Sequence, residues 1–216
     1  MNDDADTWFE DTWNYRDTVA YPELIGATSD GRISTIPYVA FEQIGAVQVD
    51  PRWLHCGVLA FRPPSPTAAF TFVTSGLSNA WDDARPDERS ISGLGIELRV
   101  DVSREAHWTT DVLLRISAMQ LLIGSGRMSG ARLLGVGDRM KVGAETFGKN
   151  SSVTSLIAAD GGQIQLPSGT FTLLQLFAIT DAEREHAASH GADALLTILR
   201  ARTAFPISDV TRASVV

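Results

Sequence analysis

The feature that most constrains the fold is a strictly alternating run of apolar and polar side chains over residues 96–102. The apolar positions are Ile96, Leu98, Val100 and Val102, and the polar positions are Glu97, Arg99 and Asp101. Successive side chains of a β-strand point to opposite faces of a sheet, so this run predicts a strand with one buried face. The polar set has two interpretations, a solvated strand face or a face that recognises a partner. Neighbours on one face lie about 7 Å apart, which suits ion pairs but not a carboxylate dyad.

A long buried helix is predicted next, because residues 112–123 are apolar on nearly every side. Thr109 or Thr110 can begin it, and Gly124-Ser125-Gly126 ends it. Other strands are predicted at residues 33–37, 54–61, 70–74, 133–142, 153–158, 162–166, 170–179 and 206–212, and other helices at 6–18, 181–191 and 192–202. A capping box, Thr180 with Glu183, opens the first of the last two helices. The elements do not alternate as regular βαβ units, which favours a single α+β domain.

Charge is concentrated at the N-terminal end. The first 30 residues hold eight acidic residues and one base, Arg16, and the whole chain has a formal net charge of −8. A phosphate backbone would be repelled by this end, and no basic stripe occurs elsewhere, so nucleic-acid binding is not expected. The acidic end has two interpretations: it keeps the protein soluble, or it attracts a basic protein partner.

The same end is predicted to be helical. We expect an acidic helical segment over residues 1–19, ended by Tyr21-Pro22, ahead of a domain over residues 20–216. Aromatic residues recur at spacings of four and seven, which place their rings along one side of a helix. These residues are Trp8, Phe9, Trp13 and Tyr15.

Cysteine usage and hydropathy predict a cytoplasmic protein. Cys56 is the only cysteine, so no internal disulfide can form, which is typical of a reducing compartment. No stretch approaches the roughly 20 apolar residues that a membrane span needs. The chain opens with Met1-Asn2-Asp3-Asp4, which is acidic where a signal peptide would be basic.

The sequence predicts no catalytic residue, metal site or cofactor. The nucleophile-elbow pattern Gly-x-Ser-x-Gly is absent, and the four histidines are in no recognisable arrangement. His186 and His190 are four apart, but the flanking residues do not match a metal-binding helix, so we interpret them as surface residues. Cys56 lies in a predicted strand and is interpreted as a small core residue.

A charged loop around Trp81 is the other candidate binding element. An aromatic side chain among charges can anchor a partner, although a ring folded back onto the core is an equally good interpretation. The predicted partner-binding residues are Trp81, Asp82, Asp83, Asp87 and Glu88, together with Glu97, Arg99 and Asp101 of the alternating strand.

Several short motifs, taken in order, resemble one known family. They are VDPRWL at 49–54, FVTSGLS at 72–78, SGLGIELRV at 92–100, LPSG at 166–169 and PISDVTR at 206–212. Over residues 20–212 this set is similar to the suppressor-of-fused domain, in its short bacterial form. The resemblance implies an α+β domain with a central mixed, mainly antiparallel sheet flanked by helices, and it implies protein binding rather than catalysis.

The resemblance also implies how such a protein binds its partner. Animal members sequester a transcription factor by gripping a short peptide as an added strand, and bacterial members are proposed as immunity proteins near toxin genes. Animal members carry an acidic residue after a Ser-Gly that follows the long helix, but the matching stretch here is Ser129-Gly130-Ala131, and a tyrosine of that site falls at Met119. Transcription-factor binding is therefore not carried over to this chain.

Three functional hypotheses remain. The first is a non-enzymatic protein-binding module, either a toxin-neutralising immunity protein or a regulatory protein. The second is a hydrolase or small-ligand-binding enzyme, which would need a pocket lined by a histidine and a nucleophile. The third is a scaffold that forms a homodimer through an exposed sheet edge.

Overall fold

The computed structural model describes residues 3–63, 65, 68–81 and 89–216. Its strands are β1 (Ser29–Thr35), β2 (Gly57–Phe61), β3 (Phe70–Ser75), β4 (Ile91–Val102), β5 (Arg139–Lys141), β6 (Ser155–Leu166), β7 (Gly169–Ile179) and β8 (Ile207–Ser208). Its helices are α1 (Asp3–Tyr15), the π-helical turn η1 (Arg16–Ala20), α2 (Tyr21–Ile25), α3 (Tyr38–Glu42), the 3₁₀ turn η2 (Pro51–His55), α4 (His107–Gly124), α5 (Ala144–Phe147), α6 (Asp181–His190) and α7 (Ala192–Arg202).

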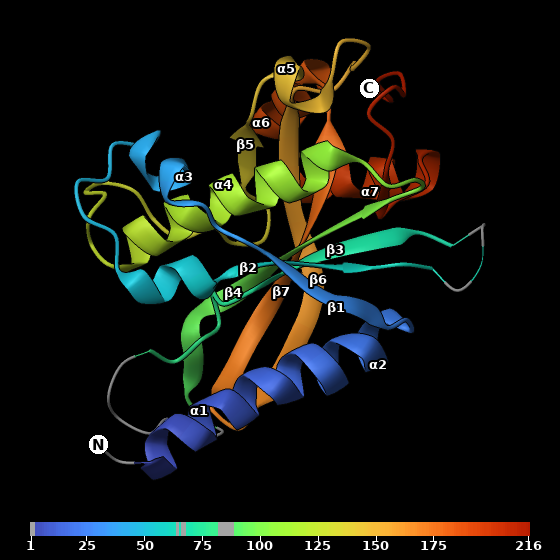
Figure 1. Ribbon diagram of the computed structural model, residues 1–216. Coiled ribbons are helices and arrows are strands. Elements are labelled where there is room, and N and C mark those ends of the chain that lie inside the picture. Colours follow the sequence, from blue (N-terminus) through green and yellow to red (C-terminus); the bar gives the residue numbers. More distant parts are fainter. Residues whose placement is uncertain (1–2, 64, 66–67, 82–88) are drawn as a thin grey trace.

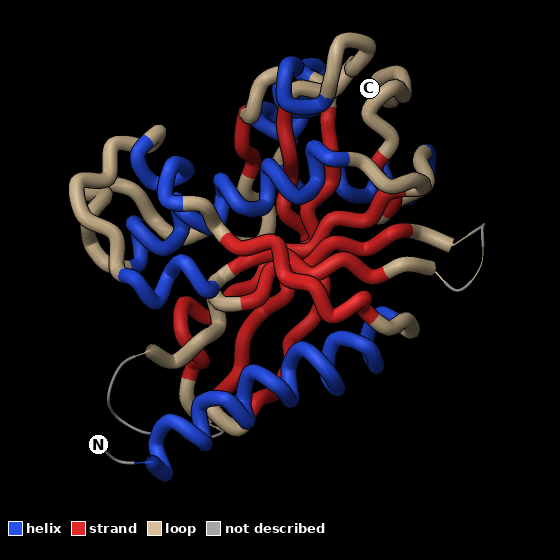
Figure 2. The backbone as a smooth tube through the Cα atoms, in the orientation of Figure 1, coloured by secondary structure: helices blue, strands red, loops and turns tan. Residues whose placement is uncertain are grey.

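The eight strands found among the described residues belong to one sheet. Their order is β1-β2-β3-β4-β7-β6-β5, and β8 lies beside the end of β4. Only the pairs β4–β7 and β4–β8 are parallel, and the other neighbours are antiparallel. Helices cover both faces of the sheet, with α1 to α2 on one side and α3 and α4 on the other (Figures 1 and 2). The predicted α+β domain with a mixed, mainly antiparallel sheet is confirmed.

The larger core lies between the sheet and α4. Ten residues of α4 are buried, and its apolar side chains pack with those of β2, β3, β4 and β7. This confirms the prediction of a buried helix over residues 112–123. The helix begins two residues earlier than predicted, and the hydroxyl of Thr109 donates to the carbonyl oxygen of Ala106 within its first turn (2.6 Å).

A second core lies on the other face, under the N-terminal helical run. Tyr21 is fully buried there, and its ring makes edge-to-face contacts with Phe61 and Phe171 (6.4 Å between centroids in each case). The helical run passes through Tyr21 to Ile25, so the prediction that Tyr21-Pro22 ends it is wrong. Proline is tolerated because it lies in the first turn of α2, where a missing N–H costs little.

The predicted boundary between residues 19 and 20 falls inside this helical run. The π-helical turn η1 spans it, and the backbone N–H of Tyr21 donates to the carbonyl oxygen of Arg16 five residues earlier. The extra residue in this turn lets Arg16 and Tyr21 share the buried side of the helix. The division into an acidic segment and a domain stays a prediction.

The sequence predicted two separate strands over residues 153–158 and 162–166, whereas the structure has one strand there, β6. It runs unbroken over residues 155–166 against β7, and the pairing shifts register between Asp160 and Gln163. Two glycines, Gly161 and Gly162, form this irregularity. The two glycines between the predicted strands therefore form a β-bulge within one strand and not a turn between two strands.

The capping box at the start of α6 is confirmed, and it does more than cap a helix. The backbone N–H of Thr180 donates to Glu183 Oε2 (2.9 Å), while the Thr180 hydroxyl accepts from the Glu183 N–H (3.2 Å). The Glu183 carboxylate also accepts two hydrogen bonds from Arg212 (2.5 and 2.6 Å). Glu183 thereby holds the C-terminal segment against α6.

The same arrangement sets the ionisation of Glu183. Burial alone would raise its pKa, but the hydrogen bonds from Arg212 and from the backbone of Thr180 and Val215 outweigh burial and lower the pKa. Because the pKa is lower in the folded chain, the stabilisation is complete above about pH 4.3 and is lost as the pH falls through the folded value.

We expect Glu183→Gln to reduce the free energy of unfolding at neutral pH and to flatten its decline below about pH 4.3. Denaturant unfolding followed by circular dichroism from neutral to acidic pH measures both effects. Glu185→Gln on the same helix is the control, since the Glu185 side chain is 73% exposed. Identical pH profiles for the Glu183→Gln variant and the wild type would contradict the assignment.

Within the residues described, no helix combines the length and the hydrophobicity that crossing a bilayer requires.

Candidate functional site

Two of the sequence motifs, those over residues 72–78 and 92–100, meet at one buried carboxylate, that of Glu97 in β4. Glu97 is 0% exposed. Its hydrogen-bond donors are the backbone N–H groups of Gly76 (2.9 Å) and Ser78 (2.8 Å), the hydroxyls of Ser78 (2.8 Å) and Thr74 (2.5 Å), and the guanidinium of Arg16 (3.4 Å). A buried carboxylate needs several donors to offset its lost hydration, and this loop supplies them.

Arg16 reaches this carboxylate from η1 and is itself only 1% exposed. Its Nη1 also lies within hydrogen-bonding distance of Ser78 Oγ (2.9 Å) and Asn79 Oδ1 (2.7 Å), while its Nε donates to Asp17 Oδ1 (2.8 Å) and its Nη2 to Ser75 Oγ (2.5 Å). Burial alone would lower the pKa of Arg16, but Asp17, Tyr21 and Glu97 outweigh burial and raise it, so the side chain stays charged. The helical run is thus tied to the sheet by a paired and fully hydrogen-bonded charge.

Two glycines of the motifs are required by close approaches around this network. A Cβ at Gly76, where φ is +135°, would lie 2.4 Å from the sulfur of Cys56. A Cβ at Gly93, where φ is +55°, would lie 2.6 Å from the carbonyl oxygens of Leu77 and Asn79. Only glycine fits at either position, because both the space and the backbone conformation exclude a side chain.

The alternating strand does not present the solvated polar face described as one interpretation above. Glu97 and Asp101 are 0% and 1% exposed, and only Arg99 retains an accessible side chain. Asp101 accepts hydrogen bonds from the Thr71 hydroxyl and from Arg99 Nε (3.0 Å). The helical run covers this part of the sheet at Glu97, a long-range contact that alternation within one strand does not reveal.

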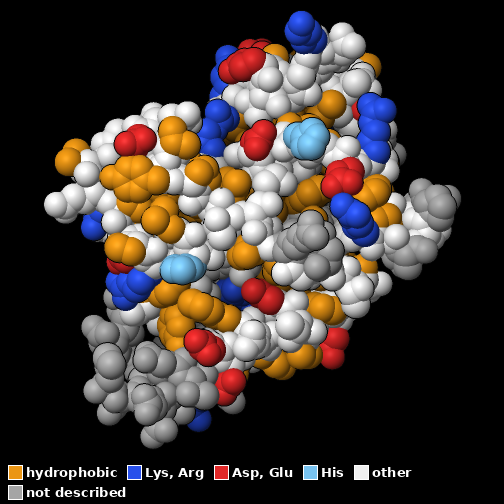
Figure 3. Space-filling view, in the orientation of Figure 1, with side chains coloured by type: hydrophobic (Ala, Val, Ile, Leu, Met, Phe, Trp, Pro, Cys, Tyr) orange, Lys and Arg blue, Asp and Glu red, His pale blue; other side chains and the backbone are white. Residues whose placement is uncertain are grey.

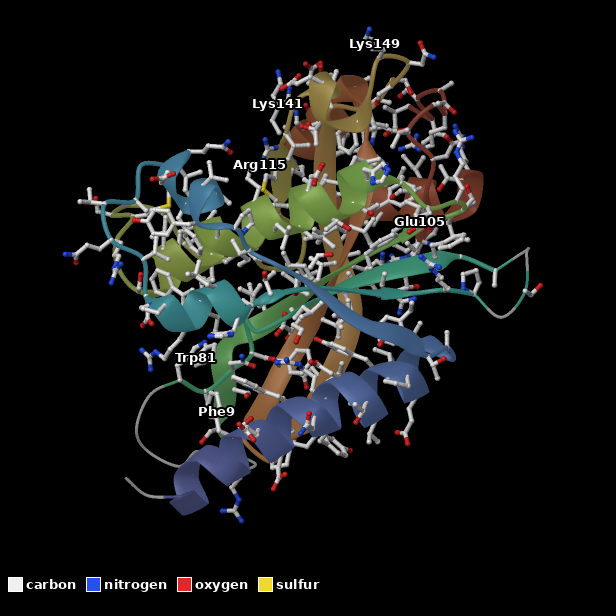
Figure 4. The ribbon with its side chains drawn as sticks, viewed as in Figure 1. Phe9, Trp81, Glu105, Arg115, Lys141 and Lys149 are labelled. Carbon is white, nitrogen blue, oxygen red and sulfur yellow. The ribbon has the colours of Figure 1, made fainter. Side chains whose placement is uncertain are left out.

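Trp81 lies in an aromatic cluster at the end of the N-terminal helix. Its ring centroid is 5.3 Å from those of Phe9 and Trp13, and Figure 4 shows Phe9 and Trp81 next to each other. Arg52 lies over the Trp81 ring (5.7 Å) and donates to the Trp81 carbonyl oxygen (2.9 Å). The ring is partly buried against the core, as one interpretation predicted, and its role as an anchor stays a prediction. Asp82, Asp83, Asp87 and Glu88 lie outside the described residues.

A groove of about 420 Å³ lies on the other side of η2. It is lined by Ile44, Gly45, Ala46, Val47, Gln48, Leu122, Arg127 and Met128. Arg127 lies over the Trp53 ring (4.9 Å) and donates to the Gln48 carbonyl oxygen (2.5 Å). Val47, at the edge of the groove, is 91% exposed. Apolar side chains line the groove together with the amide of Gln48 and the guanidinium of Arg127.

The turn η2 connects the aromatic cluster and the groove. Asp50 caps it by accepting from the backbone N–H of Arg52 (2.9 Å), and Arg52 also pairs with the Asp50 carboxylate (2.7 Å). The hydrogen bond from Arg52 lowers the pKa of Asp50. Trp53 points inward and stacks on Phe41 (5.8 Å). The VDPRWL motif therefore presents Arg52 on one side and supports Arg127 on the other, and we call the cluster, turn and groove together the η2 surface.

The other residues that the sequence analysis considered for chemistry are Cys56, His186 and His190. Cys56 is buried, as predicted for a core residue, and burial raises the pKa of its thiol to about 12. His186 and His190 stack on α6, with ring centroids 4.3 Å apart. In the part of the chain that the structure describes, no three His, Cys, Asp or Glu side chains are grouped as a metal site would require.

The fold and this site define a single-domain α+β protein in which a buried ion pair fixes a helix to a sheet. The suppressor of fused (SUFU) family model matches residues 52–213, well over half of the chain, and the chain belongs to that family. The resemblance found in the sequence is thereby confirmed. The helical run that supplies Arg16 lies outside the matched residues.

Three solved structures share the fold. A suppressor of fused homologue from Neisseria gonorrhoeae has a TM-score of 0.63 at 15% identity, covering 94% of this chain and 97% of its own. A Sufu–Fu complex has a TM-score of 0.59 at 17% identity, covering 85% and 93%. Drosophila Suppressor of Fused has a TM-score of 0.57 at 18% identity and 74% coverage, and the match spans only 42% of the Drosophila chain. No curated protein sequence matches this chain.

We expect Arg16→Met to destabilise the protein by about 3–5 kcal/mol, because the change leaves the Glu97 charge buried without its cation. The double variant Arg16→Met/Glu97→Gln should recover part of this loss, a coupling that denaturant unfolding of all four proteins measures. Arg62→Met is the control and should cost less than about 1 kcal/mol, since Arg62 and its partner Glu105 are both more than half exposed. Additive single losses would show that Arg16 and Glu97 do not depend on each other.

Cys56 should resist thiol reagents in the native protein. Burial and the raised pKa leave almost no thiolate at pH 8. Reaction with a chromogenic disulfide reagent should be negligible before unfolding and should reach one thiol per chain in denaturant. Fast labelling of the native protein would mean that the Gly76–Cys56 contact opens in solution.

Proposed function

We propose that this protein binds another protein through the η2 surface and thereby neutralises a toxin or regulates an enzyme sterically. The observation that carries the proposal is the groove lined by apolar side chains with Arg127 and the exposed Val47 at its edge. Membership of the suppressor of fused family supports protein binding, and one structural neighbour is a Sufu–Fu complex.

The surface is suited to contact because it is already organised. Stacking of Arg127 on Trp53 and of Arg52 on Trp81 holds both cations in place, and Asp50 fixes the turn between them. Little conformational freedom remains to be lost on binding, so more of the contact energy appears as affinity. An aromatic and arginine-rich patch is also the composition that dominates binding energy in protein interfaces.

The charge of the groove indicates the kind of segment it accepts. Arg127 is its charged lining residue, and the Ser129-Gly130-Ala131 stretch that follows adds no carboxylate. An apolar segment with an acidic residue or a carboxylate at its end is complementary to such a groove. Covering a toxin's active site with the surrounding surface would then be enough to neutralise it.

The test is co-expression with a toxin encoded beside this gene. Wild-type protein should restore growth and should co-purify with the toxin, whereas Val47→Glu and Arg127→Glu should each weaken binding at least about tenfold by placing a charge against the complementary segment. Val136→Glu and Arg139→Glu are matched controls on exposed positions away from the groove. Reversing Asp82, Asp83, Asp87 and Glu88 to lysine tests the charged loop separately.

Two results would overturn the proposal. Equal neutralisation by the groove variants and their controls would place the contact elsewhere. Turnover of any substrate by the purified protein that disappears with one side-chain change would favour the enzyme alternative over binding.

A further inference from the structure

One flank of the N-terminal helical run carries a stripe of three partly exposed apolar side chains. Tyr15, Val19 and Leu24 are 42%, 37% and 45% exposed. They recur after four and five residues, and the longer step matches the extra residue of η1. The three side chains therefore follow one another along a flank of the helical run, each three residues after one of the buried residues Thr12, Arg16 and Tyr21.

Contrary to the prediction from the sequence, the described aromatic residues of this run do not share one face. Phe9 and Trp13 contact Trp81 on the inner side, and Thr12, Arg16 and Tyr21 are buried there. Tyr15 points outward instead. The exposed residues Asn14 and Thr18 carry polar side chains, so the apolar stripe lies between the buried face and a polar face of the helical run.

The stripe is bordered by carboxylates. Glu10, Asp11 and Glu23 are exposed on the same helical run, and Asp11 precedes Tyr15 by one turn while Glu23 follows Val19 by one turn. The base of this run, Arg16, is inside the protein and paired with Glu97. Among the described side chains of residues 9–25, the charged ones that are exposed to solvent are therefore all acidic. In Figure 3 apolar and acidic side chains lie side by side along the lower edge of the molecule, over this run.

We propose that this stripe is a second protein-docking surface, distinct from the η2 surface, and that its partner is a segment with an apolar stripe flanked by lysine or arginine. Apolar side chains that alternate with carboxylates along one row are complementary to apolar side chains that alternate with lysine or arginine, because opposite charges attract across an interface. The run over residues 9–25 is about 25 Å long, which matches a partner helix of similar length.

A second copy of this chain is a poor occupant. Symmetric pairing of two such helices would bring the acidic borders of both copies together, and like charges across an interface oppose association. The borders also carry no described base that could offset this repulsion within the helix. Charge therefore selects a basic partner over self-association.

The probe is a synthetic helical peptide of about 20 residues, with leucines repeating every three to four positions and lysines on both sides of them. Binding is followed by fluorescence anisotropy of the labelled peptide at about 0.05 M and 0.5 M salt. Wild-type protein should bind this peptide, should bind more weakly at the higher salt concentration, and should not bind a peptide in which glutamate replaces lysine.

Matched variants locate the binding site. Val19→Ser should weaken binding about fivefold to tenfold through lost apolar contact, while Val136→Ser, an exposed valine on the loop before β5, should not. The triple change Glu10→Gln/Asp11→Asn/Glu23→Gln should weaken binding about tenfold, and Glu42→Gln/Asp111→Asn/Glu185→Gln, with the same change in net charge, less than about threefold. Circular dichroism checks that each variant is folded.

Three outcomes would overturn the inference. Equal weakening by both triple variants would mean attraction by net charge alone. Wild-type affinity in Val19→Ser would exclude the stripe. A wild-type dimer in light scattering that dissociates on Val19→Ser would identify a second copy as the occupant. Because the helix variants leave the groove intact, toxin neutralisation tests the proposed function independently of this result.

Discussion

The contact between the Arg16 guanidinium and the Glu97 carboxylate determines much of this structure, because both charges lie where water cannot reach them. Neither could be buried alone: backbone N–H groups and hydroxyls donate to Glu97, and Asp17, Ser75, Ser78 and Asn79 accept from Arg16. The position of the helical run, the glycines at 76 and 93 and the shape of the loop from Thr74 to Asn79 all follow from the need to surround this pair.

The same pair explains why the motifs over residues 72–78 and 92–100 contribute little to the outer surface. Thr74, Ser78 and Glu97 direct their polar groups inward, so their chemistry serves the attachment of a helix and not the recognition of a partner. We propose that recognition is left to side chains that packing constrains less, at the η2 surface and along the helical run. A family built in this way can keep its scaffold while its partners change.

Much of the fold could be predicted from local pattern. The alternation of residues 96–102, the apolar run of α4 and the Thr180–Glu183 capping box each depend on neighbours within one element, and each was confirmed. The burial of Glu97 could not be predicted in this way, because its partner Arg16 is 81 residues away in sequence. The Thr-Ser-Gly-Leu-Ser and Ser-Gly-x-Gly-x-Glu motifs held the available signal, since glycines beside small hydroxyl residues are suited to surround a buried anion. The groove beside Arg127 combines segments near residues 45 and 125, so no local pattern could reveal it.

The pairing of strand β4 affects how the chain folds while it is being synthesised. One of its sides pairs with β3, which precedes it, whereas the other side pairs with β7 and β8, which lie roughly 70 to 110 residues further on. During synthesis, the middle of the sheet therefore emerges from the ribosome with one side unpaired. It stays so until residues 169–179 and 207–208 have followed. An unpaired strand of this kind is a site where nascent chains can associate with one another, so protection at that stage, by a chaperone or by rapid synthesis, would favour a good yield of folded protein.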